Sequence, residues 1–408
     1  MLTPVLIAPQ RMAQPVLAHG ASAPAGAEIP TPMESLVLAT HPEQPPLGPA
    51  VSIPAAAELG IASSIVSGIG GVIGRAISGW LAGVRFISFG TIYKLEQAIT
   101  KVKEAIHKPL DQLPVPIIDR PFVIVPGWTT ETKAFQPLVE HLTRNSSNGG
   151  QCFYVQQGAF YTMDANGDLQ AVAAGAVPKD AKVFEMIFSD NRQAPDKNVV
   201  EMRANFDAIK AATAWDKFDV QGYSMGGINT RLYIDQGGDA VNRFLMLGTP
   251  NRGVHFANLA RDVFEKDVRW AAAFGKLQST DLDALTWLQP EDQSAPLADL
   301  NSRWPQQKTK VVTLTVGTDV MPTPSRDNLL GITYGDGLID ADSLNLPNSH
   351  TIVLHNAMQH GLLNDDETVQ HLRAVYFGWG LPMTAVDPFP EGDDEYIQML
   401  PPRAPATP

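Results

Sequence analysis

A serine in a glycine-rich stretch is the first residue of this sequence that could do chemistry. Residues 220–227 read Val-Gln-Gly-Tyr-Ser-Met-Gly-Gly, so Ser224 has a glycine two positions before it and another two positions after it. Strand-forming residues begin at Phe218, and a helix is predicted after the stretch, to about Asp235. A Gly-x-Ser-x-Gly pattern between a strand and a helix is typical of a nucleophile elbow, in which only glycine leaves room for the tight backbone. Ser224 is therefore a candidate nucleophile.

A serine hydroxyl needs a base to remove its proton, and late histidines supply the candidates. His350 precedes the last predicted strand, at residues 351–354, His355 ends it, and His360 lies in the loop before the final predicted helix. In folds that carry a nucleophile elbow of this kind, the serine, the acid and the histidine follow one another in that order along the chain. The base is therefore expected on the loop after the final strand. We predict His360 as the base and keep His355 in reserve.

Two aspartates compete for the acid that orients the histidine. Asp319 directly follows the predicted strand at residues 311–316, where such acids often lie. Asp336 lies in Tyr-Gly-Asp-Gly-Leu-Ile, residues 334–339, and its flanking glycines indicate a constrained, exposed loop. Position alone favours Asp319, and the local motif favours Asp336.

Short apolar strands alternate with helices from about residue 119, and these elements must position the candidate residues. The predicted strands cover residues 122–125, 151–155, 183–188, 218–221, 244–247, 311–316 and 351–354, and the predicted helices cover residues 133–144, 199–212 and 367–376. Such alternation predicts an α/β fold with a mostly parallel sheet and helices on both faces. Residues 160–172 predict a hairpin. Its acidic turn at residues 164–168 lacks the glycine position and closing glutamate of an EF-hand, so a turn is favoured over a calcium loop.

Residues 255–308 leave this alternation and predict a helical cap inserted at a strand end. The segment is rich in bulky apolar residues: Phe256, Phe264, Trp270, Phe274, Trp287 and Trp304. Apolar residues on a mobile cover would suit a substrate with acyl chains. Alternatively, they pack the cap's own core.

Composition excludes several kinds of site and partner. The net charge of −13 argues against nucleic acid and against electrostatic docking on an anionic bilayer. The single cysteine, Cys152, excludes an intramolecular disulfide and a cysteine-rich zinc site. We predict no cofactor and no metal site.

Five motifs in order resemble the α/β-hydrolase superfamily, and within it bacterial lipases and PGAP1-like esterases. The motifs are Phe-Val-Ile-Val-Pro-Gly-Trp at residues 122–128, Gly-Tyr-Ser-Met-Gly-Gly at 222–227, Leu-Gly-Thr-Pro-Asn-Arg-Gly at 247–253, Gly-Asp-Gly-Leu-Ile at 335–339 and His-Gly-Leu-Leu-Asn-Asp at 360–365. The resemblance covers roughly residues 119–378 and implies an α/β-hydrolase fold.

The resemblance also implies roles for single residues. It favours Asp336 as the acid and the backbone amides of Trp128 and Met225 as the oxyanion hole. Lipases of this group can hold a structural calcium near the acid loop, although no clear motif for one is present. The sequence departs from the group in two places, because Pro126 stands where a histidine is usual in the oxyanion loop, and Tyr223 stands where many lipases have histidine.

The rest of the chain divides around this domain. Residues 1–57 are rich in proline and alanine and predict a disordered leader, and residues 58–115 predict an apolar, glycine-rich segment followed by an amphipathic helix. The hydrolase domain is expected over residues 116–380, followed by a disordered, acidic, proline-rich tail over residues 381–408. Residues 59–90 either insert into a membrane or pack on the main domain.

The expected function is a serine carboxylic-ester hydrolase, a lipase, esterase or phospholipase, whose partner is a lipid or other ester substrate. One alternative is an acyltransferase or soluble-ester hydrolase with the same triad. A second alternative is a membrane-active effector in which residues 59–90 insert into lipid. A secreted or membrane-associated location is favoured, with a cytoplasmic one as the alternative.

Overall fold

The computed structural model describes residues 110–266, 281–307, 310–319, 321–324, 332–347, 349–355 and 360–380. The predictions for the leader, for residues 59–90, for the amphipathic helix and for the tail lie outside the described residues. Within the described part, no helix has the length and apolar character to cross a membrane.

The described strands form a nine-stranded sheet in the order β11-β8-β7-β6-β1-β5-β2-β3-β4 and a two-stranded ribbon, β10-β9. The strands are β1 (Phe122–Val125), β2 (Cys152–Gln156), β3 (Ala159–Met163), β4 (Leu169–Val172), β5 (Val183–Met186), β6 (Phe218–Tyr223), β7 (Val241–Leu247), β8 (Val312–Thr318), β9 (Met321–Pro324), β10 (Ile332–Gly335) and β11 (His350–Leu354). All pairings from β11 to β2 are parallel, whereas β3 and β4 add antiparallel pairs at one edge. The predicted mostly parallel sheet is confirmed.

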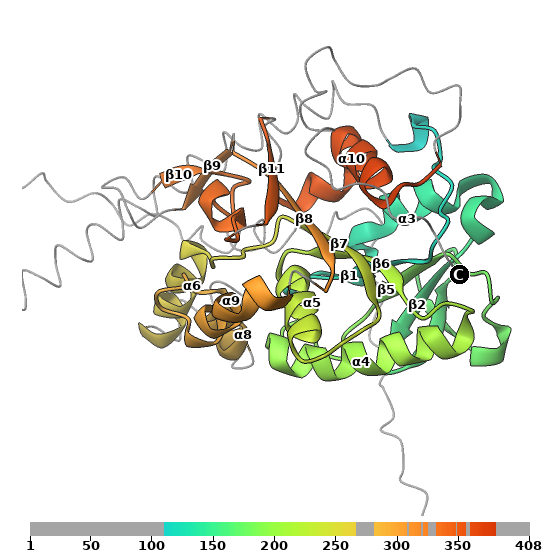
Figure 1. The fold of residues 1–408 in the computed structure, drawn as a ribbon, viewed down its shortest axis with the longest axis horizontal. Helices are drawn as coiled ribbons and strands as arrows, with labels where there is room; N and C mark the ends of the chain where they lie inside the picture. The colour runs from blue at the N-terminus through green and yellow to red at the C-terminus, as the bar shows by residue number, and fades with distance from the viewer. Residues whose placement is uncertain are drawn as a thin grey trace, which may run out of the picture.

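Helices cover both faces of the sheet (Figure 1). The α-helices are α3 (Gln136–Thr143), α4 (Pro195–Ala212), α5 (Met225–Asp235), α6 (His255–Lys266), α8 (Asp281–Leu288), α9 (Ala295–Gln307) and α10 (Glu367–Phe377). The 3-10 helices are η1 (Leu110–Gln112), η2 (Thr132–Phe135), η3 (Arg144–Gly149), η4 (Ala174–Ala176), η5 (Ala341–Leu344) and η6 (His360–Asp365).

Two apolar clusters fill the space between sheet and helices. Phe206 of α4 and Ile228 of α5 belong to the cluster on one face, and Leu138 of α3 and Leu372 of α10 belong to the cluster on the other. Both faces are therefore dry, which is why the central strands are apolar rather than alternating. Helix α4 begins at Pro195, earlier than predicted, because proline is favoured in the first helical turn.

The predicted insertion carries α6, α8 and α9 between strands β7 and β8. These helices pack on the same cluster as α4 and α5, through residues such as Leu285 and Leu300. Phe256 and Trp304 are 8 % and 0 % exposed and belong to the same apolar cluster, so for these two residues the structure favours the alternative that they pack in a core. Residues 267–280, with two further aromatic residues of the insertion, lie outside the described residues.

Candidate active site

Ser224 lies at the turn between strand β6 and helix α5. Its φ of 53° and ψ of −129° form a strained conformation for a residue with a Cβ. Neighbouring glycines make the turn possible, because a Cβ at Gly226 would lie 2.2 Å from the Val125 carbonyl oxygen, and one at Gly222 would lie 2.6 Å from the Gly227 Cα. The predicted requirement for glycine at both positions is confirmed, and the turn leaves the serine half-buried.

The loop after strand β1 approaches the serine. A Cβ at Gly127 would lie 2.7 Å from the Ser224 Cβ and 3.3 Å from its Oγ, so this loop can only pass with glycine at that position. Trp128 comes next in the chain, and Met225 is the first residue of α5. Amides in the first turn of a helix have no acceptor within that helix. Both predicted oxyanion donors therefore belong to backbone that borders Ser224.

His360 and Asp336 form a buried pair. The His360 Nδ1 lies 2.7 Å from the Asp336 Oδ2, and the two side chains are 13 % and 1 % exposed. The His360 amide also donates to the Asp336 carbonyl oxygen at 2.9 Å. The second carboxylate oxygen, Oδ1, accepts from the amides of Leu338 at 3.0 Å and Ile339 at 2.7 Å. A carboxylate at Nδ1 favours the tautomer that leaves Nε2 as the acceptor.

The ribbon of β9 and β10 holds the loop that carries Asp336. A Cβ at Gly335 would lie 2.7 Å from the Thr323 Oγ1, and the Gly337 amide donates to the same oxygen at 2.9 Å. Gly337 also has a φ of 90°, which side chains other than glycine rarely adopt. The two glycines thus constrain the loop as their sequence pattern indicated, but the loop is buried rather than exposed.

Tyr223 connects the histidine to the residue beside the nucleophile. The Tyr223 and His360 rings stack with centroids 5.0 Å apart at 27°, and the phenol donates to the His360 carbonyl oxygen at 2.8 Å. The Ser224 amide donates to the Leu247 carbonyl oxygen at 2.9 Å, and a Cβ at the next residue, Gly248, would lie 3.1 Å from the His360 Nδ1. The serine and the histidine therefore lie close together beside the end of strand β7, at the carboxyl ends of the parallel strands. Burial raises the pKa of the Tyr223 phenol well above its usual range, so it remains a donor.

The reserve residues also form a pair, but at the surface. His355 Nδ1 lies 3.0 Å from the Asp319 Oδ1, and the side chains are 70 % and 30 % exposed. His350, the third histidine considered, is the exposed first residue of β11. An exposed ion pair contributes little free energy. Burial and the contact with Tyr223 distinguish the His360 pair from this one.

Asp281, which the sequence analysis did not single out, connects the inserted helices to the oxyanion loop. It begins helix α8 and is 0 % exposed. One of its carboxylate oxygens accepts from the Trp128 indole nitrogen at 3.2 Å, and the other accepts from the Arg192 guanidinium at 2.8 Å. These partners lie 153 and 89 positions away in the sequence, so no local pattern could have indicated the contact.

A buried polar network joins the segment after His360 to strand β6. The Arg373 Nε donates to the Gln221 Oε1 at 2.8 Å, and the Gln221 amide donates to the Asn364 Oδ1 at 2.8 Å. Burial lowers the pKa of Arg373 to about 9, and the nearby Asp365 carboxylate opposes this shift. The network anchors η6, which begins at His360, to the strand that ends at the elbow.

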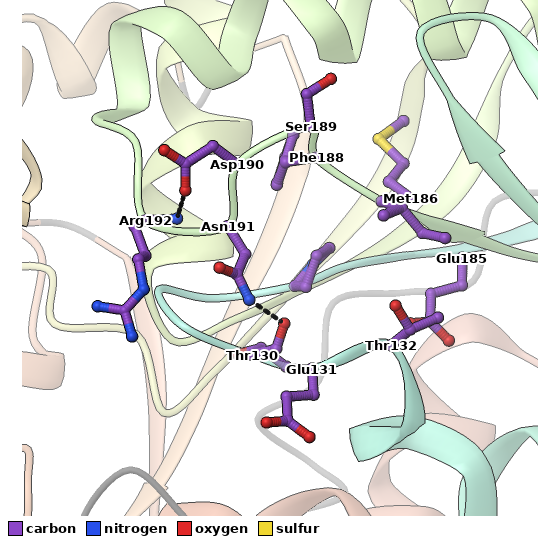
Figure 2. A pocket seen from close by; sticks show the side chains of 12 residues that line it. Thr130, Glu131, Thr132, Glu185, Met186, Phe188, Ser189, Asp190, Asn191 and Arg192 are labelled. Carbon is purple, nitrogen blue, oxygen red and sulfur yellow. Dashed lines mark hydrogen bonds between the residues drawn. The ribbon is translucent and has the colours of Figure 1, made fainter. Parts of the chain in front are cut away.

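A pocket of 460 Å³ opens beside the oxyanion loop (Figure 2). Its lining consists of Pro126, residues 130–132 and residues 185–192. The two walls are joined where the Thr129 amide donates to the Asn191 carbonyl oxygen at 2.9 Å and the Asn191 side-chain amide donates to the Thr130 carbonyl oxygen at 3.1 Å.

The acidic turn of the β3–β4 hairpin, at residues 164–168, was the alternative calcium loop of the sequence. The Asp164 Oδ1 accepts from the Asn166 amide at 2.8 Å and from the Asp168 amide at 3.0 Å, which is the pattern of a turn closed by its own side chain. In the described part of the chain, no three or more histidine, cysteine or acidic side chains are grouped so that they could hold a metal ion. The absence of a metal site stays a prediction, as does the structural calcium that the resemblance would allow near the acid loop.

Comparisons with known proteins found a family match and several similar solved structures. Residues 117–266 match the model of a family described as "Alpha/beta hydrolase of unknown function (DUF915)". Among solved structures, the chain is similar to the Bacillus licheniformis lipase BlEst2 in mature form, with 16 % identity and a TM-score of 0.43 over 65 % of this chain and 94 % of that one. It is also similar to a putative cell surface hydrolase from Lactobacillus plantarum, with 16 % identity and a TM-score of 0.39 over 64 % of this chain and 93 % of that one. The family match and the mostly parallel sheet with helices on both faces identify the α/β-hydrolase fold that the sequence predicted.

Proposed function

We propose that the protein is a serine hydrolase that cleaves carboxylic esters through an acyl-enzyme. Ser224 is the nucleophile, His360 the general base and Asp336 the acid that orients it. The observation that carries this proposal is the buried His360–Asp336 pair, 2.7 Å apart, at the sheet edge where Ser224 takes its strained conformation. Asp319 and His355 are not assigned a catalytic role, because their pair is exposed.

The chemistry follows from the roles of the three side chains. Ser224 Oγ attacks the ester carbonyl carbon while His360 Nε2 takes the hydroxyl proton. The carbonyl oxygen becomes an oxyanion, for which the amides of Trp128 and Met225 are the proposed donors. When the intermediate collapses, the bond to the alcohol breaks and His360 returns the proton to the leaving oxygen. Water then attacks the acyl-enzyme by the same sequence and releases the carboxylic acid.

The proposed substrates are acyl esters of lipids. This part of the proposal is supported by the resemblance of the five motifs to those of bacterial lipases and by Trp287 of the 255–308 insertion, which is half-buried. A soluble-ester hydrolase or an acyltransferase would use the same three side chains, and product analysis with an added alcohol would identify transfer. The membrane role predicted for residues 59–90 concerns a segment outside the described residues and remains a prediction.

The test compares the wild-type protein with Ser224→Ala on p-nitrophenyl esters of increasing acyl length and on phospholipid vesicles. We expect kcat to fall about 10⁶-fold, as when the serine of such a triad is removed. A preference for longer acyl chains would support a lipid substrate. Equal hydrolysis by both proteins would refute the assignment of Ser224.

A further inference from the structure

The pocket beside the oxyanion loop presents polar side chains to solvent. Of its apolar lining residues, Met186 and Phe188 are only 0 % and 4 % exposed, so they offer almost no surface. Polar atoms make up slightly more than half of the accessible lining, and residues 130–132 and 189–191 bring hydroxyl, carboxyl and amide groups to it, beside the half-buried Ile187. Its volume of 460 Å³ lies within the range of about 300–1,000 Å³ that is usual for small-molecule sites. Such a lining offers hydrogen-bonding groups to a polar part of a substrate.

Glu185 lines the same pocket from strand β5 and is 1 % exposed. Its Oε2 has no hydrogen-bond partner among the described residues. Burial raises the pKa of this carboxyl well above its usual range and so favours its uncharged form, which has one O–H donor and one acceptor oxygen. A buried group of this kind is costly to leave unpaired, which calls for a partner that both donates and accepts. A hydroxyl group has both capacities.

The charges around the pocket oppose an anionic ligand. Glu131 and Asp190 line it with carboxyl groups, whereas the cation among its described lining residues, Arg192, is bonded to Asp281 at 2.8 Å. Figure 2 shows Arg192 at the opposite end of the pocket from Glu185 and Thr132. A phosphate placed near Glu185 would therefore meet carboxyl groups rather than a cation. The charges thus disfavour an anionic group, and among uncharged groups a hydroxyl matches the donor and acceptor of Glu185.

We propose that this pocket, formed by Glu185, the 130–132 loop and residues 189–191, binds a neutral polyhydroxylated part of the substrate. The position supports this, because Pro126 lines the pocket and the next residue, Gly127, is the one whose Cβ would lie 2.7 Å from the Ser224 Cβ. A substrate whose carbonyl meets Ser224 could thus extend into it. The inference rests on the proposed function and narrows the substrates to esters that contain a glycerol-like or sugar-like group.

The test measures polyol binding to the full chain without requiring catalysis. Saturation-transfer NMR with glycerol, with myo-inositol and with acetate as an anionic comparison is run on wild type, Glu185→Gln, Glu185→Leu and Asp219→Asn. We expect wild type to bind both polyols and not acetate, and Glu185→Leu to bind myo-inositol about tenfold more weakly, the factor for one lost hydrogen bond. Glu185→Gln should retain binding, because glutamine keeps a donor and an acceptor. Asp219→Asn, at another buried carboxyl with a raised pKa but outside the pocket, should behave as wild type.

Two results would overturn the proposal: no polyol binding by wild type, or equal binding by wild type and Glu185→Leu. Equal saturation of acetate would also refute it, since the pocket would then not select neutral hydroxyls. Hydrolysis of p-nitrophenyl butyrate by wild type tests the proposed function separately. Absence of hydrolysis with Glu185-dependent polyol binding would reject the enzyme assignment, whereas hydrolysis without polyol binding would reject this pocket alone.

Discussion

Replacing Asp336 by asparagine should abolish most activity without removing the hydrogen bonds that hold the acid loop. The Asp336 Oδ1 accepts from two backbone amides, at 3.0 and 2.7 Å, while Oδ2 faces the His360 Nδ1 at 2.7 Å. An asparagine in the same position must keep its carbonyl oxygen toward the two amides, because its NH₂ group cannot accept from them. The NH₂ group then faces Nδ1 and requires Nδ1 to be the acceptor. The imidazole proton moves to Nε2, which can no longer take the proton of Ser224.

The expected loss follows from this change of tautomer. In a serine protease triad the same substitution lowers kcat about 10⁴-fold, which corresponds to about 5 kcal/mol of transition-state stabilisation. We expect a loss of this size for Asp336→Asn in the hydrolysis of p-nitrophenyl butyrate, with KM changed little. Asp319→Asn is the matched control. Because the Asp319–His355 pair is 30 % and 70 % exposed, its loss should change kcat by less than about twofold.

The assay is a comparison of kcat and KM for wild type, Asp336→Asn and Asp319→Asn, with circular dichroism to establish that all three proteins are folded. A folded Asp336→Asn protein that keeps more than about a tenth of wild-type kcat would refute the tautomer argument. A large loss in Asp319→Asn with little loss in Asp336→Asn would instead identify Asp319 as the acid.

Three further predictions concern residues around the site. Tyr223→Phe keeps the ring that stacks on His360 but removes the 2.8 Å hydrogen bond to its carbonyl oxygen, so kcat should fall about two- to tenfold at an unchanged KM. Asp281→Ala breaks a buried ion pair and removes the acceptor of the Trp128 indole, so the free energy of unfolding should fall by about 3 kcal/mol in chemical denaturation and kcat should also decrease. Burial raises the pKa of Asp219 from 3.8 to about 6, so the folded state binds its proton more tightly than the unfolded state, and this group's contribution to stability is lost as pH rises from about 4 to about 6. The free energy of unfolding of Asp219→Asn minus that of wild type should therefore increase by at most about 3 kcal/mol between about pH 4 and about pH 6. A difference that does not change with pH would contradict the raised pKa of Asp219.

Local patterns predicted the elements that depend on local chemistry. The glycines around Ser224 indicated the turn, because a Cβ added at either one would collide with atoms of the same turn or of the adjacent strand. The β9–β10 ribbon was not predicted, since its strands are four residues each and β9 contains two prolines, which usually argue against a strand. Prolines are tolerated there because the ribbon is separate from the main sheet.

The choice between the two histidine–aspartate pairs shows what sequence order cannot supply. His355 lies 36 positions after Asp319, His360 lies 24 positions after Asp336, and both pairs form. The two pairs differ in burial, and the ring of Tyr223 contributes to the burial of His360. This contact joins residues 137 positions apart along the chain. The catalytic role of either pair remains a prediction until the substitutions are measured.

Strand β6 leads to the proposed nucleophile and also contacts the segment that carries the proposed base. Its last residue, Tyr223, bonds the His360 carbonyl oxygen, and Gln221 bonds Asn364 at the other end of the same 3-10 helix. The histidine is thus held by hydrogen bonds to the strand that leads directly to Ser224. The elements proposed to recognise substrate are attached differently, through the 130–132 loop and through the contact of Asp281 with the oxyanion loop. A substitution in the pocket or in the inserted helices therefore need not move the histidine relative to the nucleophile.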